Sequence, residues 1–209
     1  MTDAPQAPPH AETPITGSPL LVLIGFMGAG KSTLARMLSA ELGCPLIDLD
    51  EEIARIHGTI PELFATRGES GFRAIEHNEL DRVLAGLTLP AVLALGGGAF
   101  MQPANRDLLE RHSATVIFLD APFEVLYQRI RDTAEERPLA ADPDRLRSLY
   151  ELRRPTYLLA HHTLDTSSGD PAALLTSLVQ LANRLSPQHA DSGRAGDPSG
   201  ISAPGRVKL

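Results

Sequence analysis

The sequence predicts a three-layer α/β/α fold around a five-stranded parallel β-sheet. Short apolar runs alternate along the chain with longer segments of helical periodicity, the order expected of successive right-handed βαβ units. The apolar runs are hydrophobic at nearly every position rather than at alternate ones, as expected of parallel strands covered by helices on both faces. The expected strands are residues 20–24, 45–49, 91–95, 115–119 and 162–166.

Helices are expected between these strands and after the last one. Leu34, Leu38 and Leu42 recur at i, i+4 and i+8, which places them on one face of a helix. The leucines that repeat this pattern in the last helix are Leu174, Leu175, Leu178, Leu181 and Leu185. The expected helices are residues 31–42, 51–57, 60–67, 70–86, 104–111, 122–132, 143–160 and 171–185.

The domain organisation follows from length and local composition. A chain of 209 residues is long enough for one domain with a sizeable core and short for two. Residues 1–18 and 187–209 contain few large apolar side chains, so they cannot bury enough surface to offset the entropy of ordering and are expected to be disordered tails. The folded domain is therefore expected to span residues 19–186, and we expect it to be a monomer.

Charge and cysteine content narrow the possible partners and location. The net charge is −7, which argues against nucleic acid as the main partner because such proteins usually present a basic face. The single cysteine, Cys44, excludes an intrachain disulfide. No apolar run approaches the roughly 20 residues that span a bilayer, and the first residues lack an apolar signal core. We therefore expect a cytoplasmic protein without membrane partners.

The segment 25–32, GFMGAGKS, matches the phosphate-binding P-loop and stands where that motif belongs, between a buried strand and a helix. Its glycines allow successive backbone N–H groups to point at phosphate oxygens, and the helix start adds a favourable dipole. Lys31 is expected to reach the β- and γ-phosphates, and Ser32 to offer its hydroxyl to Mg²⁺. The expected nucleotide-binding residues of the loop are Gly28, Ala29, Gly30, Lys31, Ser32 and Thr33.

The alternative, a glycine-rich turn without a ligand, is disfavoured because motif and context agree. The chain lacks the guanine-reading element of GTPase switches and is too short for a motor or transporter ATPase. These exclusions leave the small P-loop kinases, which transfer the γ-phosphoryl group of ATP to a metabolite.

Two aspartates follow the second expected strand. Asp48 and Asp50 stand at the carboxyl end of that strand, the edge where ligands bind in parallel sheets, and both could face the phosphates. We assign Asp48 to Mg²⁺ and Asp50 to the acceptor hydroxyl, as a base or an orienting group. The alternative is that Asp50 only caps the helix expected at 51–57.

Five motifs in order resemble those of shikimate kinase: GFMGAGKST at 25–33, DLDEEI at 48–53, GESGFRAIE at 68–76, GGG at 96–98 and RPL at 137–139. The resemblance covers about residues 19–170. It implies a P-loop kinase fold with a lid, and an enzyme that uses ATP with Mg²⁺. The implied reaction is phosphorylation of shikimate at its 3-hydroxyl, in aromatic amino-acid biosynthesis.

The resemblance also implies the residues that bind the acceptor. Arg73 is a candidate for binding the carboxylate of shikimate, with Glu76 orienting it; the alternative is a plain i,i+3 ion pair on a helix surface. Gly96, Gly97 and Gly98 would let the backbone approach the substrate closely, whereas the alternative is a permissive turn. Spacing relative to Tyr157 favours Arg153 as a second carboxylate-binding residue, and Arg154 is the alternative.

The polar segment 132–144 resembles the lid of these kinases. Arg137 would fold over the nucleotide, stabilise the transferring phosphoryl group and help exclude water; the alternative is a loose surface loop. Lys31, Asp50 and Arg137 are thus the implied catalytic residues. Adenine contact would depend on backbone groups and on Arg129 or its neighbours. The seven histidines show no zinc-like spacing, so no metal beyond Mg²⁺ is expected.

Two other functions remain open. A gluconate kinase-like enzyme would share the P-loop and the lid but should lack the paired Asp-x-Asp and Phe-Arg motifs. A regulatory module would bind ATP without transferring its phosphoryl group, a role that the presence of Asp50 and Arg137 disfavours.

Overall fold

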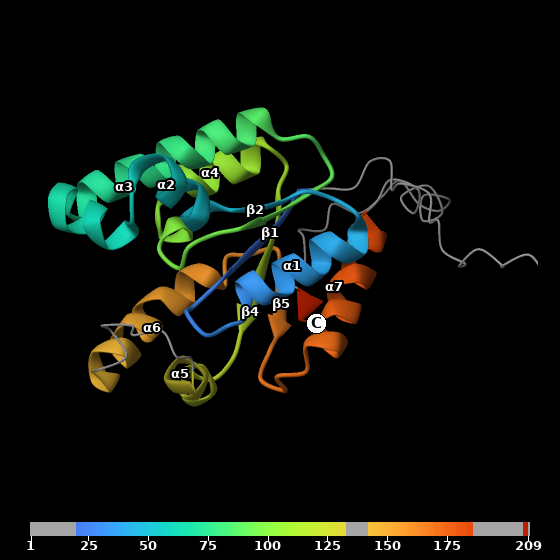
Figure 1. Cartoon of the computed structure of the whole chain (residues 1–209). Helices are drawn as coiled ribbons and strands as arrows, with labels where there is room; N and C mark the ends of the chain where they lie inside the picture. Colours follow the sequence, from blue (N-terminus) through green and yellow to red (C-terminus); the bar gives the residue numbers. More distant parts are fainter. Residues whose placement is uncertain (1–19, 133–141, 186–206, 209) are drawn as a thin grey trace, which may run out of the picture.

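The computed structural model of the protein describes residues 20–132, 142–185 and 207–208 (Figure 1). One sheet contains six strands in the order β2-β3-β1-β4-β5-β6, and all neighbouring strands are parallel. The strands are β1 (Leu20–Gly25), β2 (Leu46–Asp48), β3 (Ala91–Ala94), β4 (Thr115–Asp120), β5 (His162–Asp165) and β6 (Val207–Lys208).

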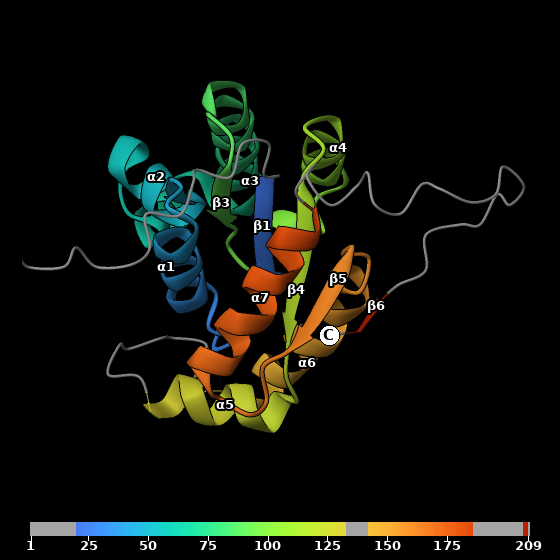
Figure 2. The ribbon, with the colours of Figure 1, turned by 90° about the vertical axis from the view of Figure 1, so that its right-hand side faces the viewer.

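Seven α-helices and one 3₁₀ helix connect or flank these strands within the described residues. They are α1 (Lys31–Leu42), α2 (Leu49–His57), α3 (Ile60–Gly86), η1 (Ala99–Met101), α4 (Pro103–Arg111), α5 (Phe123–Asp132), α6 (Pro143–Tyr157) and α7 (Pro171–Leu185). α1 and α7 pack together on one side of the sheet, whereas α3, α4 and α6 lie on the other side (Figures 1 and 2). The predicted three-layer fold with parallel strands is therefore confirmed.

The core is built by the apolar runs that predicted the strands. All six residues of β1 are buried, as are the four of β3, because both faces of the central strands are covered by helices. From the helices, the periodic leucines complete this core: Leu34 and Leu38 of α1 and Leu178 of α7 are buried. Leu42 is only partly buried, although it packs against the same core.

α3 bends at the position where the sequence predicts an interruption between two helices. The helices expected at 60–67 and 70–86 form one helical segment with a bend at Gly68, whose φ of 67° and ψ of 179° are not helical. A capping box between Thr59 and Glu62 starts this segment, since each residue's side chain accepts a hydrogen bond from the other's backbone N–H. The two expected helices are therefore both present, and the non-helical backbone of Gly68 lies between them.

The far edge of the sheet differs from the prediction. Val207 and Lys208 form β6 beside β5, in parallel register with His162 and Thr163. These two residues lie inside the expected C-terminal tail 187–209, where no strand was predicted because a two-residue strand leaves no periodic signal. The five predicted strands are all present, and β6 adds a sixth.

The sheet brings three motifs to one edge. β1, β2 and β3 are adjacent and parallel, so their carboxyl ends at Gly25, Asp48 and Ala94 open on the same side. The phosphate loop, the two aspartates and the three glycines follow these strand ends directly. Among the described residues, no helix is both long and apolar enough to cross a membrane.

Candidate active site

The phosphate loop connects β1 to α1 through residues in glycine-specific conformations. Gly25, Gly28 and Gly30 have φ values of 151°, 78° and 90°, which side-chain-bearing residues rarely adopt. Space is limited as well, since a Cβ on Gly25 would lie 2.7 Å from the carbonyl oxygen of Leu119 and one on Gly28 would lie 2.8 Å from that of Leu126. α1 begins at Lys31, immediately after the loop, so its first N–H groups face the loop interior.

Lys31 lies folded over this loop. Its Nζ donates hydrogen bonds to the carbonyl oxygens of Gly25 at 3.0 Å and Phe26 at 3.1 Å. These contacts hold the ammonium group at the mouth of the loop, between the strand end and the first turn of α1. A phosphate bound by the loop amides would therefore meet this positive charge directly.

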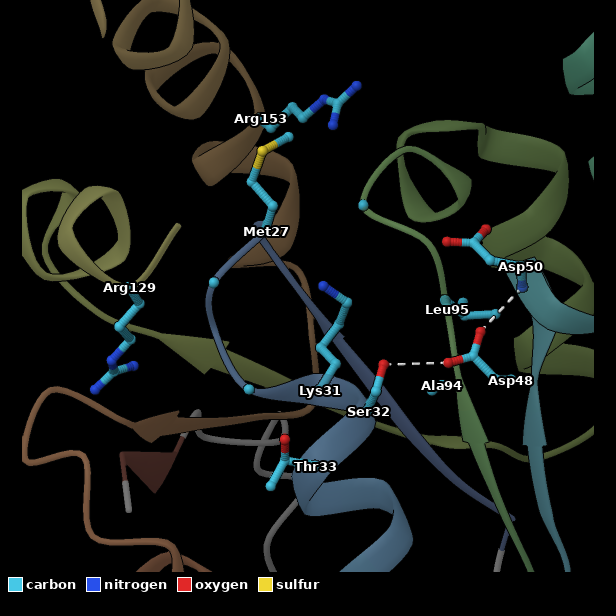
Figure 3. Close-up of a pocket in the computed structure, with 13 residues that line it drawn as sticks. Met27, Lys31, Ser32, Thr33, Asp48, Asp50, Ala94, Leu95, Arg129 and Arg153 are labelled. Atoms are coloured by element: carbon cyan, nitrogen blue, oxygen red, sulfur yellow. Dashed lines mark hydrogen bonds between the residues drawn. The ribbon is translucent and has the colours of Figure 1, made fainter. Parts of the chain in front are cut away.

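Ser32 and Asp48 connect the loop helix to the neighbouring strand. The Ser32 hydroxyl donates a hydrogen bond of 3.2 Å to Oδ2 of Asp48 (Figure 3). The other oxygen of Asp48 accepts the backbone N–H of Asp50 at 3.1 Å and thereby caps α2. The cap of α2 is thus Asp48, and the alternative that Asp50 serves only as the helix cap is wrong, since the helix begins two residues earlier than expected.

Asp50 projects beyond this cap into the site. Burial and, secondarily, the charge of Asp48 raise the pKa of its carboxyl group above the usual aspartate value, while Lys31 and Arg73 oppose the shift. A carboxyl group with such a pKa binds a proton more readily than a solvated aspartate. This property suits a group that accepts a proton or a strong hydrogen bond from a hydroxyl.

One cavity of about 470 Å³ unites the predicted donor and acceptor residues. Arg129 and Asp50 lie at its opposite ends, with Lys31 between them in the view of Figure 3. It is lined by Met27, Gly28, Gly30, Lys31, Ser32, Thr33, Asp48, Asp50, Ala94, Leu95, Gly97, Arg129 and Arg153. Nine of the predicted site residues are in this lining; Ala29 is buried under the loop and lines a smaller adjoining pocket.

The three glycines after β3 each make room for a different polar side chain. A Cβ on Gly96 would lie 2.8 Å from Oδ2 of Asp50, and one on Gly98 would lie 2.6 Å from Cζ of Arg73. A Cβ on Gly97 would be 3.4 Å from both the Arg153 guanidinium and the Tyr157 hydroxyl. None of the three has a positive φ, so it is space for these side chains, rather than an unusual backbone conformation, that requires glycine.

Arg73 lies behind Gly98, and it is not among the residues that line the cavity. Its guanidinium pairs with Glu76 at 2.8 Å and lies over the ring of Phe72, with 5.3 Å between Cζ and the ring centroid. The predicted pairing with Glu76 is confirmed, but it is not an exposed surface pair, because Glu76 is only 1% exposed. Gln102 donates a second hydrogen bond to the same Glu76 oxygen at 2.9 Å.

The two arginines of α6 point to different places. Arg153 lines the cavity near Met27 (Figure 3). Arg154 instead forms an ion pair with Asp120, with 2.6 Å between Nη2 and Oδ2. Adjacent residues on a helix project about 100° apart, which explains why only one of them faces the site.

Tyr157 was not predicted to have a role, although its position defined the spacing of Arg153. It is fully buried, and its hydroxyl donates a hydrogen bond to the carbonyl oxygen of Gly97. Burial raises the pKa of Tyr157 to about 12, so the phenol keeps its proton and can donate this bond. The sequence shows a tyrosine four residues after Arg153, which could have marked Tyr157 as a site residue. Its bond to the Gly97 carbonyl could not be predicted from the sequence.

Two further predictions concern the nucleotide. Arg137 and most of the expected lid fall in residues 133–141, outside the described residues. Arg129 donates a hydrogen bond of 2.6 Å to the carbonyl oxygen of Thr166. It also lines the adjoining pocket of about 160 Å³, which continues from the phosphate loop to Gly169 and α7.

Ser32 and Asp48 fit a magnesium ion chemically. Mg²⁺ prefers oxygen ligands and is commonly held by one or two protein oxygens together with substrate phosphates. The Ser32 hydroxyl and the Asp48 carboxylate present such oxygens side by side at the phosphate loop. Within the described part of the chain, no cluster of three or more histidine, cysteine, aspartate or glutamate side chains could hold a metal by itself.

Comparisons with known proteins agree with this geometry. The family model "Shikimate kinase" matches residues 27–183. A shikimate kinase from Ruegeria pomeroyi is 40% identical over 169 residues, covering 79% of this chain and 82% of the relative. The crystal structure of shikimate kinase from Bacteroides thetaiotaomicron superposes with a TM-score of 0.70 at 31% identity, covering 78% of this chain and 98% of that one.

A shikimate kinase structure from Acinetobacter baumannii, in complex with shikimate, has a TM-score of 0.68 at 35% identity and covers 78% of this chain and 92% of its own. A gluconokinase from Sinorhizobium meliloti has a TM-score of 0.52 at 17% identity, covering 80% of this chain and 95% of that one, a likeness of fold alone. The gluconate kinase-like alternative is therefore only a distant neighbour. The chain, with its phosphate loop, paired aspartates and glycine triplet in one cavity, belongs to the shikimate kinase family.

Proposed function

We propose that the protein transfers the γ-phosphoryl group of ATP to the 3-hydroxyl of shikimate, a step of aromatic amino-acid biosynthesis. The observation that carries this proposal is the shared cavity, in which Asp50, Gly97 and Arg153 face the phosphate loop and Lys31. A nucleotide phosphate and a small anionic acceptor can therefore be bound side by side in this cavity, each by its own set of residues.

On the nucleotide side, the loop amides from Gly28 to Thr33 hold the phosphates, and Lys31 places its charge on the β- and γ-phosphoryl oxygens. Ser32 and Asp48 hold Mg²⁺, which neutralises phosphate charge when bound. Arg129 lines both the cavity and the smaller adjoining pocket, which supports a contact with the adenine end of the nucleotide.

On the acceptor side, the guanidinium groups of Arg73 and Arg153 bind the carboxylate of shikimate, because a planar fork of N–H groups matches two carboxylate oxygens. The missing side chain of Gly98 leaves room for the Arg73 guanidinium next to the glycine triplet. The backbone of Gly96, Gly97 and Gly98 packs close to the ring. Asp50 accepts a hydrogen bond from the reacting hydroxyl and takes up its proton as the new P–O bond forms.

Arg137, which lies outside the described residues, is proposed to act on the transferring phosphoryl group. Its guanidinium would stabilise charge on the phosphoryl group during transfer, and closure of the segment would exclude water that could otherwise accept the phosphoryl group. That the protein acts in the cytoplasm and as a monomer stays a prediction. Light scattering of the purified protein tests the monomeric state.

The deciding experiment is a coupled ADP-release assay with ATP and Mg²⁺ in the presence of shikimate, of gluconate, or of no acceptor. We expect rapid ADP release with shikimate and only background release in the other two reactions. Release with gluconate alone would show a gluconate kinase-like enzyme. Nucleotide binding without release in any reaction would point to a regulatory module.

A further inference from the structure

Gln102 connects the start of α4 to the acceptor-binding part of α3. Its side-chain nitrogen Nε2 donates a hydrogen bond of 2.9 Å to Oε2 of Glu76 and lies 3.5 Å from the carbonyl oxygen of Arg73. Its own carbonyl oxygen accepts the N–H groups of Asn105 and Arg106 in the first turn of α4. The side chain therefore reaches out from a rigid helix start rather than from a free loop.

Two donors meet at one buried oxygen. Oε2 of Glu76 accepts from Nη1 of Arg73 at 2.8 Å as well as from Gln102, and Glu76 is almost completely buried. Arg73 reaches this oxygen from the same helix, whereas Gln102 reaches it from a different element. Since the glutamate side chain has three rotatable bonds, a donor from outside its helix restricts the orientations in which it can receive Arg73.

Arg73 has little freedom once Glu76 is fixed. Its guanidinium lies over the ring of Phe72 and packs so closely against Gly98 that a Cβ there would lie 2.6 Å from Cζ. Nη1 of the guanidinium is paired with Glu76, and Nη2 lies 3.5 Å from Oε1 of Glu69, whose side chain is 73% exposed. Of its two carboxylate partners, only Glu76 is buried, so Glu76 is the one that fixes the orientation of Arg73.

We propose that Gln102 is a positioning residue for the acceptor: by holding Glu76 it sets the orientation of Arg73 that the shikimate carboxylate requires. This inference rests on the proposed function, because it assigns Arg73 to that carboxylate. Gln102 does not itself touch the nucleotide or the reacting hydroxyl.

The ionisation of Glu76 supports this role. Burial raises the pKa of Glu76, and Asp50 on α2 adds to the rise, whereas Arg73 and the hydrogen bond from Gln102 lower it. Loss of the Gln102 amide should therefore raise the pKa of Glu76 further. Glu76 would then become protonated, and release Arg73, at a higher pH than in the parent protein.

The test compares Gln102→Leu and Gln102→Glu with Gln180→Leu, a matched substitution on the exposed face of α7. For Gln102→Leu we expect the KM for shikimate to rise roughly tenfold, since a hydrogen bond to a charged group is lost. The KM for ATP should not change. The acid-side fall of kcat/KM for shikimate should move to higher pH. Gln180→Leu should match the parent protein throughout.

Gln102→Glu should also raise the KM for shikimate at neutral pH, because it places a second carboxylate against Glu76. Its KM should recover partly on acidification, when the new carboxyl group regains a proton to donate, whereas that of Gln102→Leu should worsen. A residue with only a structural role would lower Tm without these opposite pH responses.

A Gln102→Leu protein with unchanged KM for shikimate and an unshifted acid limb would overturn the inference. An equal rise of both KM values would do so too, since it would indicate general loosening of the fold. If the parent protein itself fails to phosphorylate shikimate, the proposed function is wrong. If the parent and Gln102→Leu are equally active, only the inference about Gln102 is wrong.

Discussion

The Cα of Gly96 packs directly against the carboxylate of Asp50, so that a Cβ at position 96 would lie 2.8 Å from Oδ2. The two residues come from neighbouring strand ends, β3 and β2, and meet only because these strands are adjacent in the sheet. The position of the proposed base therefore depends on the absence of a side chain more than forty residues away in the sequence.

Gly96→Ala should displace Asp50 and reduce kcat about 10- to 100-fold, because a shift of about 1 Å in a reacting group is costly. The KM for ATP should stay close to that of the parent protein, since the phosphate loop is not touched. The matched control is Gly86→Ala at the end of α3, where an added Cβ meets nothing within 4 Å. Steady-state kinetics of both variants check this, and full activity of Gly96→Ala would contradict the contact.

Asp50→Asn should retain nucleotide affinity while kcat for shikimate falls by about 10²- to 10⁴-fold, the usual contribution of a general base. The amide keeps the shape of the side chain but cannot take up a proton. Isothermal titration with an ATP analogue and single-turnover kinetics measure the two properties separately. Loss of nucleotide binding would instead assign Asp50 to the donor side.

Asp50 should make the stability of the folded protein and its activity depend on pH in opposite directions. Its pKa is raised in the folded state, so the folded protein binds this proton more tightly than the unfolded chain and gains stability as the pH falls from the raised pKa toward the unfolded value. Activity is lost over the same interval because the base is protonated. Thermal unfolding should accordingly show Asp50→Asn to be more stable than the parent protein at neutral pH, with a smaller gain at acid pH.

Ser32→Ala should raise the Mg²⁺ concentration needed for half-maximal activity by about tenfold, equivalent to about 1.4 kcal/mol of binding free energy. The substitution removes one proposed metal ligand and also the hydrogen bond to Asp48. Ser39→Ala, at a half-buried position of the same helix away from the phosphate loop, is the matched control. Titration of activity with Mg²⁺ at fixed ATP measures the effect, and coincident curves for the two variants would exclude Ser32 from the metal site.

Arg153 and Arg154 should give opposite results despite being adjacent. Arg153→Leu should raise the KM for shikimate about 10- to 100-fold, because a charged partner of the carboxylate is removed. Arg154→Leu should leave both KM values unchanged and lower the free energy of unfolding by no more than about 1 kcal/mol, since its side chain is 40% exposed in the pair with Asp120. Kinetics and denaturant unfolding of the two variants distinguish these roles, and a KM effect at Arg154 would reverse the assignment.

Local sequence signals predicted most of the secondary structure. β1 and α1 were predicted because an unbroken apolar run and a periodic leucine pattern each specify one element without outside contacts. The two-residue β6 was not predicted, because it depends on a partner strand. The start of α2 was predicted two residues late, because Asp48 caps it.

The sequence by itself determined the chemistry of this protein: a phosphate loop, a pair of aspartates, a glycine triplet and arginines in a characteristic order. The reason is that each motif is local, so its residue types and spacing are visible along the chain. Only the tertiary structure decided which arginine of α6 faces the cavity, what each glycine of the triplet makes room for, and which groups Gln102 and Tyr157 bond to. These relationships join residues that the sheet order and helix packing bring together across long stretches of sequence, and no local pattern specifies them.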